Sequence, residues 1–204
     1  MQFPFLPMLS RPGPLPRGPG WSFEVKWDGF RALVSTQEGL RVSSRRGWDM
    51  THAVPGLAEL PAGLVLDGEL IAFNEEGDPH FPLLSRRILH GDRSTPVTLM
   101  IFDLLQANGE NTSLLPYAER RARLEQLGLD GPYWSTPEAF DDGAGLYAAV
   151  CERGLEGVVA KWRASPYRPG ARGWIKIKNP DYWRRESEIA AVRRSAERRA
   201  AHRA

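Results

Sequence analysis

Apolar and polar residues alternate along several short segments of the chain, which is the pattern typical of half-buried β-strands. A longer apolar run over 64–73 is interrupted only by Asp67 and Glu69 and is expected to be a central strand. Most links between these segments are too short for parallel crossovers, so the strands should be mainly antiparallel. Strands are expected over 23–26, 31–36, 40–44, 64–73, 97–105, 157–162 and 173–178.

Apolar residues at helical spacing occur in fewer places. Helices are expected over 51–60, 83–89, 117–127 and 143–153. Thr51 is expected to cap the first of them, and Pro55 is expected either to break or to start it. In the 117–127 helix, four apolar residues are expected to face the core: Ala118, Ala122, Leu124 and Leu127. Strands and helices in this arrangement predict an α+β fold.

The two ends of the chain differ in composition from its middle. Residues 1–20 contain six prolines and are expected to form an extended, irregular lead-in. Beyond residue 180 the sequence becomes rich in arginine and alanine, which predicts a basic helical tail over 181–204. We interpret this tail as a solvated helix, with a DNA-contacting segment as the alternative. A single domain is then expected over 21–180.

Composition narrows the class of protein without identifying its function. The 204 residues are 42% hydrophobic and 25% charged, which excludes collagen-like, coiled-coil and wholly disordered chains. The single cysteine, Cys151, excludes an internal disulfide and a cysteine-based zinc cluster. No apolar run approaches the roughly 20 residues that span a bilayer, and the first residues do not form a signal peptide. We therefore expect a cytoplasmic location and no membrane partner.

Charged residues interrupt segments that should otherwise be buried strands. Asp67 and Glu69 are two positions apart, so alternation places both carboxylates on one face of their strand. Lys176 and Lys178 share a face for the same reason, and Lys161 ends another apolar run. Because buried charges need partners or ligands, these acids and lysines suggest a pocket for a metal-bound polyphosphate. The alternative is that they lie on the solvent face of half-exposed strands.

Residues 24–31 read Glu-Val-Lys-Trp-Asp-Gly-Phe-Arg and contain the pattern Lys-x-Asp-Gly-x-Arg. This pattern resembles the nucleotidyltransferase signature of ATP-dependent DNA ligases, RNA ligases and mRNA capping enzymes. The other elements of that family follow in the family's order: Ser44-Arg45-Arg46-Gly47, Asp67-Gly68-Glu69, Phe102-Asp103-Leu104-Leu105, 156–161 and 174–178. The likeness covers roughly residues 8–180 and implies that 21–180 is a nucleotidyltransferase (adenylation) domain.

The segments between these motifs are most similar to the ligase domain of bacterial non-homologous end-joining ligases. The similarity is carried by the residues around Met8, by Leu-Pro-Tyr-Ala-Glu-Arg-Arg at 115–121 and by Ser-Pro-Tyr-Arg-Pro-Gly at 165–170. Capping enzymes, which use GTP, fit these segments less well. The resemblance implies a nucleotidyltransferase (ATP-grasp-like) core of mostly antiparallel sheets flanked by helices, and a location in the bacterial cytosol or nucleoid.

The resemblance also implies an activity, that of an ATP-dependent DNA ligase. Lys26 would attack the α-phosphate of ATP to form lysyl-AMP, AMP would pass to a DNA 5′-phosphate, and the 3′-hydroxyl would seal the nick. A lysine must lose its proton before it attacks, and nearby cations such as Lys176, Lys178 and a metal would favour that loss. The same two lysines would bind the α-phosphate, and Asp28 would orient the site beside the nucleophile.

The family also implies residues for the metal, the sugar and the phosphates. Glu69 and Glu156 would organise Mg²⁺ (or Mn²⁺) and the ribose. Arg31 and Arg46 would contact the sugar and the phosphates. Because Arg45 and Arg46 are adjacent, the sequence leaves open which of the two faces the ligand.

The same resemblance implies three residues for the part of the site that binds the base of ATP. Glu24 would meet the adenine edge, Phe102 would stack on the ring, and Lys161 would belong to the ATP site. From its local sequence alone, Phe102 is more typical of a core residue, so only the motif order favours stacking. We interpret Trp27 and Trp174 as packing residues.

Complete ligases of this kind continue into an OB-fold domain after the last motif, and too few residues follow Lys178 here for such a barrel. We therefore expect a minimal catalytic core that acts on nicked or broken double-stranded DNA. Without an OB-fold partner it would be limited to partial steps; a separate OB-fold, primase or Ku-like protein is the expected kind of partner. Two alternatives stay open: a non-catalytic nucleotide- or DNA-binding remnant, and an RNA ligase or capping-type nucleotidyltransferase.

Overall fold

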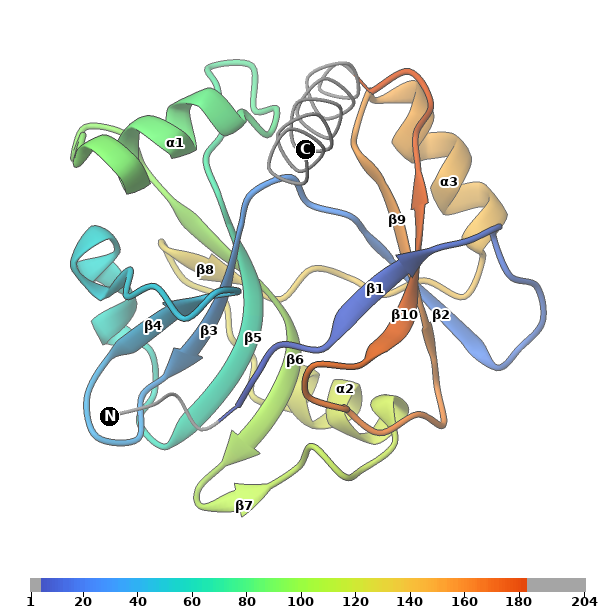
Figure 1. Cartoon of the computed structure of the whole chain (residues 1–204), viewed down its shortest axis with the longest axis horizontal. Helices are drawn as coiled ribbons and strands as arrows, with labels where there is room; N and C mark the ends of the chain where they lie inside the picture. Colours follow the sequence, from blue (N-terminus) through green and yellow to red (C-terminus); the bar gives the residue numbers. More distant parts are fainter. Residues whose placement is uncertain (1–4, 183–204) are drawn as a thin grey trace, which may run out of the picture.

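Two β-sheets face each other in the computed structural model, which describes residues 5–182 (Figure 1). The smaller sheet has four strands in the order β1-β10-β9-β2. Its strands are β1 (Leu9–Pro12), β2 (Trp21–Val25), β9 (Gly157–Trp162) and β10 (Arg172–Lys178). Strand β1 runs parallel to β10, whereas the other two pairs are antiparallel. Sequence segments from both ends of the chain therefore build this sheet.

The larger sheet has the order β4-β3-β5-β6-β7, with β8 pairing to β6. Its strands are β3 (Phe30–Ser35), β4 (Arg41–Ser44), β5 (Leu64–Ile71), β6 (Thr98–Ala107), β7 (Glu110–Asn111) and β8 (Trp134–Ser135). All of its pairs are antiparallel except β6 with β8. The expectation of a mainly antiparallel α+β fold is confirmed.

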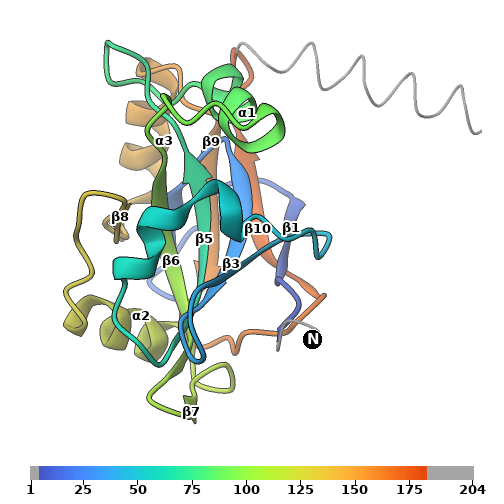
Figure 2. The ribbon, with the colours of Figure 1, turned by 90° about the vertical axis from the view of Figure 1, so that its left-hand side faces the viewer.

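Helices cover the outer sides of both sheets (Figure 2). The helical elements are η1 (Thr51–Ala53), η2 (Pro55–Glu59), α1 (Phe81–His90), α2 (Tyr117–Gln126) and α3 (Gly143–Glu152). Helix α3 packs on β2 and β9 of the smaller sheet, and α2 packs on β6 of the larger one. Among the described residues, no helix is long and apolar enough to cross a membrane.

Each sheet has one apolar face and one face that carries charge. On β5, Leu66 and Leu70 point into an apolar cluster under the helices, while Asp67 and Glu69 point toward the other sheet. On β10, Ile175 and Ile177 likewise pack with α3, while Lys176 points to the opposite face and lines the space between the sheets. Alternation along the strands thus brings the charged residues of both sheets into that space.

A β-bulge changes the direction of one side chain in β6. Asp67 of β5 pairs with Asp103, but the next residue, Gly68, pairs with Ile101, so Phe102 is an extra residue in its strand. The bulge turns Phe102 to the same side as Asp103, toward the smaller sheet, where it packs edge-on against Trp174. Alternation alone would have pointed Phe102 and Asp103 to opposite faces.

Three local expectations differ from the structure. Leu9–Pro12, within the lead-in expected to be irregular, forms β1 because it pairs with β10. Thr51 does not cap η1; it lies inside it, and its hydroxyl accepts a hydrogen bond from the Val42 amide. The helix expected over 51–60 is instead two short 3₁₀ segments, with Pro55 starting the second. The basic tail expected over 181–204 lies almost entirely outside the described residues.

The inward face of α2 also differs from the expectation. Leu124 is buried, but Ala118, Ala122 and Leu127 are exposed. The other buried residues of α2 are Tyr117, Arg120 and Arg121. Apolar spacing failed here because Arg120 pairs with the buried Asp103 and Tyr117 donates to the buried Glu24, so polar side chains face inward.

Candidate active site

A cleft lies between the charged faces of the two sheets. Its open part, the outer cleft, has a volume of about 660 Å³ and is lined by residues that include Lys26, Arg31, Arg45, Arg46, Glu69, Arg172 and Lys176. A smaller inner pocket adjoins it and shares three of these residues. Its other lining residues include Glu24, Trp27, Phe102, Lys161 and Trp174.

All four lysines of the chain lie in or beside this cleft, although arginines are spread over the whole sequence. They are Lys26, Lys161, Lys176 and Lys178. An ammonium group is a compact charge with three donors, suited to phosphate oxygens, and it becomes a nucleophile once it loses its proton. The concentration of lysine in one place therefore marks a site that handles a polyanion or forms a bond to nitrogen.

Lys26 directly follows β2, and its side chain lies beside Glu156, which directly precedes β9. The Lys26 Nζ to Glu156 Oε2 distance is 2.5 Å, and the other oxygen of this carboxylate is 3.4 Å from Lys178 Nζ. The Lys26 amide also donates to the Gly157 carbonyl at 2.9 Å, which fixes the end of β2 against the start of β9. Lys26 thus lies at the wall of the cleft with a carboxylate in reach of its proton.

A steric constraint explains why the Lys-x-Asp-Gly-x-Arg pattern has glycine at its fourth position. Gly29 lies where the chain passes from β2 to β3, close to β5. A Cβ atom at this position would lie 1.9 Å from the carbonyl oxygen of Leu70. Only glycine permits this approach, which places Lys26 and Arg31 on facing sheets a few residues apart in sequence.

Lys161 crosses the space between the two sheets. It is 1% exposed, and its Nζ lies 2.8 Å from Glu24 Oε2 and 3.0 Å from the carbonyl oxygen of Phe102. Its ammonium also lies 4.6 Å from the ring centroids of both Phe102 and Trp174. Burial lowers the pKa of Lys161, and the Glu24 carboxylate opposes that shift. Lys161 therefore joins Glu24, Phe102 and Trp174 of the inner pocket into one network.

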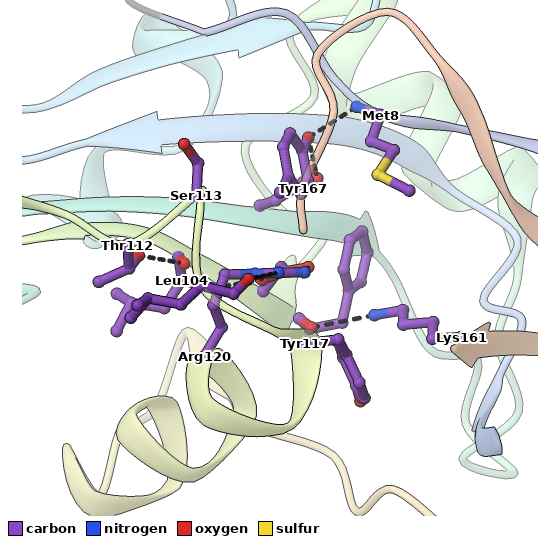
Figure 3. Close-up of polar contacts among 12 residues, drawn as sticks. Met8, Leu104, Thr112, Ser113, Tyr117, Arg120, Lys161 and Tyr167 are labelled. Atoms are coloured by element: carbon purple, nitrogen blue, oxygen red, sulfur yellow. Dashed lines mark hydrogen bonds and ion pairs between the residues drawn. The ribbon is translucent and has the colours of Figure 1, made fainter. Parts of the chain in front are cut away.

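Helix α2 carries Tyr117 and Arg120 to the same end of the cleft (Figure 3), where each makes a further contact. The Tyr117 hydroxyl donates to Glu24 Oε1 at 2.5 Å. The Arg120 guanidinium binds both oxygens of Asp103, at 2.7 and 2.9 Å, with both side chains fully buried. Tyr117 thus contacts the smaller sheet, whereas Arg120 contacts the larger one. The helix holds the two sheets together at the closed end of the inner pocket.

Arg31 is held in place by a second buried network. Its guanidinium forms a bidentate pair with Asp67, with both N···O distances at 2.5 Å, and also donates to the Met8 carbonyl at 3.1 Å. Tyr167 donates its hydroxyl to Asp67 at 2.7 Å and accepts from the Met8 amide at 2.7 Å (Figure 3). The Arg31 guanidinium lies 4.7 Å from the Phe102 ring centroid, over one wall of the pocket.

Glu69 faces the cleft in an environment that disfavours its charge. Burial raises its pKa to about 8, with Glu156 and Asp67 adding to the shift and Arg31 and Lys26 opposing it. A divalent cation would relieve this shift, because carboxylate oxygens are ligands that Mg²⁺ prefers. Among residues 5–182, no group of three or more side chains is arranged to hold a metal alone. Glu69 and Glu156 therefore suit a metal that takes its remaining ligands from phosphates and water.

The structure separates the predicted site residues into three places. The inner pocket brings together Glu24, Lys26, Arg31, Glu69, Phe102 and Lys161. Arg46 and Lys176 line the outer cleft but not the inner pocket, and Arg45 lies beside Arg46 there. Asp28 lines neither; it lies with Lys26 and Glu156 around another cavity and accepts a hydrogen bond from the Tyr182 hydroxyl at 2.6 Å. Lys178 is tied to the site through Glu156.

Sequence reasoning gave no site role to four residues that belong to these networks or line the inner pocket. They are Trp27, Tyr117, Tyr167 and Trp174. Trp174, interpreted as a packing residue, is 2% exposed and also lines the inner pocket. Both tyrosines lie in the segments 115–121 and 165–170 that carry the likeness to end-joining ligases. That likeness was the available signal, but it named no partner for either hydroxyl.

The fold and this site define a nucleotidyltransferase of the ligase type, and comparison with known families agrees. Residues 15–178 match the family model described as the ATP dependent DNA ligase domain. The chain therefore belongs to the ATP-dependent DNA ligase domain family. The family expected from the order of the motifs is confirmed.

Similar proteins include multifunctional non-homologous end joining proteins named LigD. The one from Mycolicibacterium smegmatis is 36% identical over 184 residues, which are 85% of this chain and 24% of that protein. The solved ligase domain of LigD from M. tuberculosis has a TM-score of 0.76 and 37% identity, covering 85% of this chain and 60% of that one. A structure of mycobacterial DNA ligase D complexed with ATP and MES has a TM-score of 0.75 and 35% identity over the same shares. The chain thus spans about a quarter of the curated relative.

Proposed function

We propose that this chain carries out the adenylation chemistry of an ATP-dependent DNA ligase and uses it to seal breaks in double-stranded DNA. Lys26 Nζ forms a bond to the α-phosphorus of ATP, the bond from that phosphorus to the bridging oxygen breaks, and pyrophosphate leaves. AMP then passes from Lys26 to a DNA 5′-phosphate. The adjacent 3′-hydroxyl attacks that phosphate and releases AMP.

The observation that carries this proposal is the position of Lys26. Its Nζ lies 2.5 Å from Glu156, which is the acceptor for the proton that Lys26 loses before it attacks. Arg31, Glu69 and Lys176 line the same cleft. Lys176 neutralises charge that develops on the phosphates, as electrostatic stabilisation of a transition state requires. Glu69 and Glu156 would hold Mg²⁺ (or Mn²⁺), which supplies charge neutralisation on the phosphate oxygens.

The inner pocket is assigned to the nucleoside. Phe102 and Trp174 offer aromatic surfaces, and Glu24 offers carboxylate oxygens to a donor on the base. Arg31 lies over the Phe102 ring, where it can reach the sugar. The outer cleft carries Arg45, Arg46 and Arg172, exposed side chains of the kind that bind a phosphate backbone. We assign DNA to this side of the site.

The test is covalent labelling of the full chain with ATP that carries radioactive phosphorus at the α position, in the presence of Mg²⁺. The wild type is expected to gain one label, released by acid as a phosphoramidate would be. Lys26→Ala and Lys26→Arg should both gain none; the arginine variant keeps the charge beside Glu156 but removes the nucleophile. Label retained by either variant, or absent from the wild type, overturns the proposal. A nicked duplex then tests transfer and sealing, and GTP and RNA ends serve as competing substrates.

A further inference from the structure

Helix α2 places a tyrosine hydroxyl against the carboxylate that faces the base. Tyr117 is 1% exposed, and its hydroxyl lies 2.5 Å from Glu24 Oε1. The other oxygen, Glu24 Oε2, lies 2.8 Å from Lys161 Nζ. Both oxygens of this buried carboxylate are therefore anchored, one from α2 and one from β9. A carboxylate held in this way has a fixed orientation and lone pairs in fixed directions.

The anchors also determine what Glu24 can recognise. Burial and the Glu24 charge raise the pKa of Tyr117 well above its ordinary value, so its hydroxyl remains a donor to Glu24. With a donor on each oxygen, the Glu24 carboxylate offers a ligand only acceptor positions. The 6-amino group of adenine is such a donor, whereas guanine presents a carbonyl oxygen at that position and would be repelled.

The position of Tyr117 is itself secured by the rest of α2. Three residues along the helix, Arg120 binds both oxygens of Asp103 on β6 and the backbone carbonyls of Leu115 and Ser165. Asp103 follows Phe102, the expected stacking residue. One helix thus fixes a polar group and an aromatic surface at the same end of the pocket.

We propose that Tyr117 is a positioning residue for base selection: it orients Glu24 so that the site favours purine nucleotides with a hydrogen-bond donor at position 6. The inference rests on the proposed function, because it requires that the inner pocket hold the base of ATP. It gives a role to the 115–121 segment, which no other part of the reaction uses. It also separates recognition of the base, through α2, from the chemistry at Lys26.

The experiment compares ATP with the purine ribonucleoside triphosphate that carries hydrogen in place of the 6-amino group. Adduct formation is followed by the mass of the intact full chain, which needs no labelled analogue. The wild type should prefer ATP by roughly 10- to 100-fold in kcat/KM, the range for one hydrogen bond to a charged group. Tyr117→Phe should raise KM for ATP by about tenfold with kcat within about twofold, and should leave the analogue unaffected.

A matched control is Tyr167→Phe, which also removes one buried tyrosine hydroxyl, here from Asp67. It should affect ATP and the analogue equally, because Asp67 holds Arg31 and not Glu24. Glu24→Asp withdraws the carboxylate from the Tyr117 hydroxyl while keeping Tyr117, and it should reproduce the base-selective loss. This variant replaces Tyr117→Phe in the comparison if Tyr117→Phe does not fold. Equal losses with both nucleotides, or no loss, for Tyr117→Phe overturn the proposal.

Failure of the proposed function is recognised separately. If the wild type forms no adduct with any nucleotide, the adenylation proposal fails. Calorimetric titration of wild type and Tyr117→Phe with ATP and with the analogue then tests base selection alone. A wild-type preference for ATP that Tyr117→Phe diminishes supports the role of Tyr117, and equal affinities in the wild type overturn it.

Discussion

Both faces of the larger sheet carry buried apolar residues, but one of them also carries buried ion pairs. One face packs leucine, valine and alanine side chains under the helices, in the cluster that contains Leu66 and Leu70. The opposite face carries Asp67 and Asp103, both fully buried and each paired with an arginine. Apolar packing is non-directional, whereas bidentate pairs fix orientation. The face to which we assign the nucleotide is thus the one that carries side chains held in defined directions.

The largest effect on this comparison is expected from breaking a buried pair on the charged face. Asp103→Ala leaves the Arg120 guanidinium buried without its counter-ion and should lower the free energy of unfolding by about 3–5 kcal/mol. Urea denaturation followed by circular dichroism measures this loss. The double variant Asp103→Leu with Arg120→Met removes both charges and should lose less. A double variant as unstable as the single one would show that the pair itself stabilises the fold.

Truncation of a buried side chain on the apolar face should change the stability of the fold but not its activity. Leu66 is fully buried, and Leu66→Ala should lower the free energy of unfolding by about 2–5 kcal/mol through lost burial and a cavity. The rate of adduct formation per folded molecule, measured at a temperature where the variant is folded, should stay within about twofold. A larger change in rate would contradict the separation of the two faces.

Glu69 should show the opposite combination, a loss of activity with a gain in stability. Glu69→Gln removes an acidic group from the cleft and should slow adduct formation by about 100-fold, a typical loss for one electrostatic contact in a reaction site. Burial raises the pKa of Glu69 from 4.5 to about 8, so this group contributes most to stability below pH 4.5 and its contribution is lost as pH rises toward 8.

The measurement is the melting temperature of both proteins between pH 4.5 and 8 in a metal chelator. The wild type should lose stability relative to Glu69→Gln as pH rises through this window. Parallel curves would mean that the environment of Glu69 does not disfavour its charge. A variant that melts lower at every pH would assign Glu69 a structural role.

The smallest effect is expected at the surface. Arg123 pairs with Glu110 at 2.7 Å, and both side chains are exposed. Arg123→Ala should change the free energy of unfolding by less than about 1 kcal/mol and leave adduct formation unchanged. It is a reference for Arg120→Met on the same helix, which removes an arginine that is fully buried. Similar losses from the two would contradict the importance given to burial.

The strands and the residues between the sheets could be predicted because two simple patterns agree in this sequence. Alternation in β5 places Asp67 and Glu69 on one face, and the order of motifs assigned Glu69 and Lys26 to one reaction. The direction of Phe102 could not be derived from alternation, since it depends on a bulge that appears only when β5 and β6 pair. The prediction of which α2 residues face inward was wrong, because burial of Arg120 depends on its ion pair with Asp103 on another element.

The scarcity of lysine has a practical consequence for studying this protein. Apart from the terminal amine, every primary amine in the chain lies in or beside the cleft, so an amine-reactive reagent probes one region of the molecule. Their reactivity should follow the exposed fraction of each side chain, which is 35% for Lys178, 21% for Lys26 and 1% for Lys161. Peptide mass spectrometry after brief acetylation would therefore read occupancy of the cleft directly, without engineering a reporter into the chain.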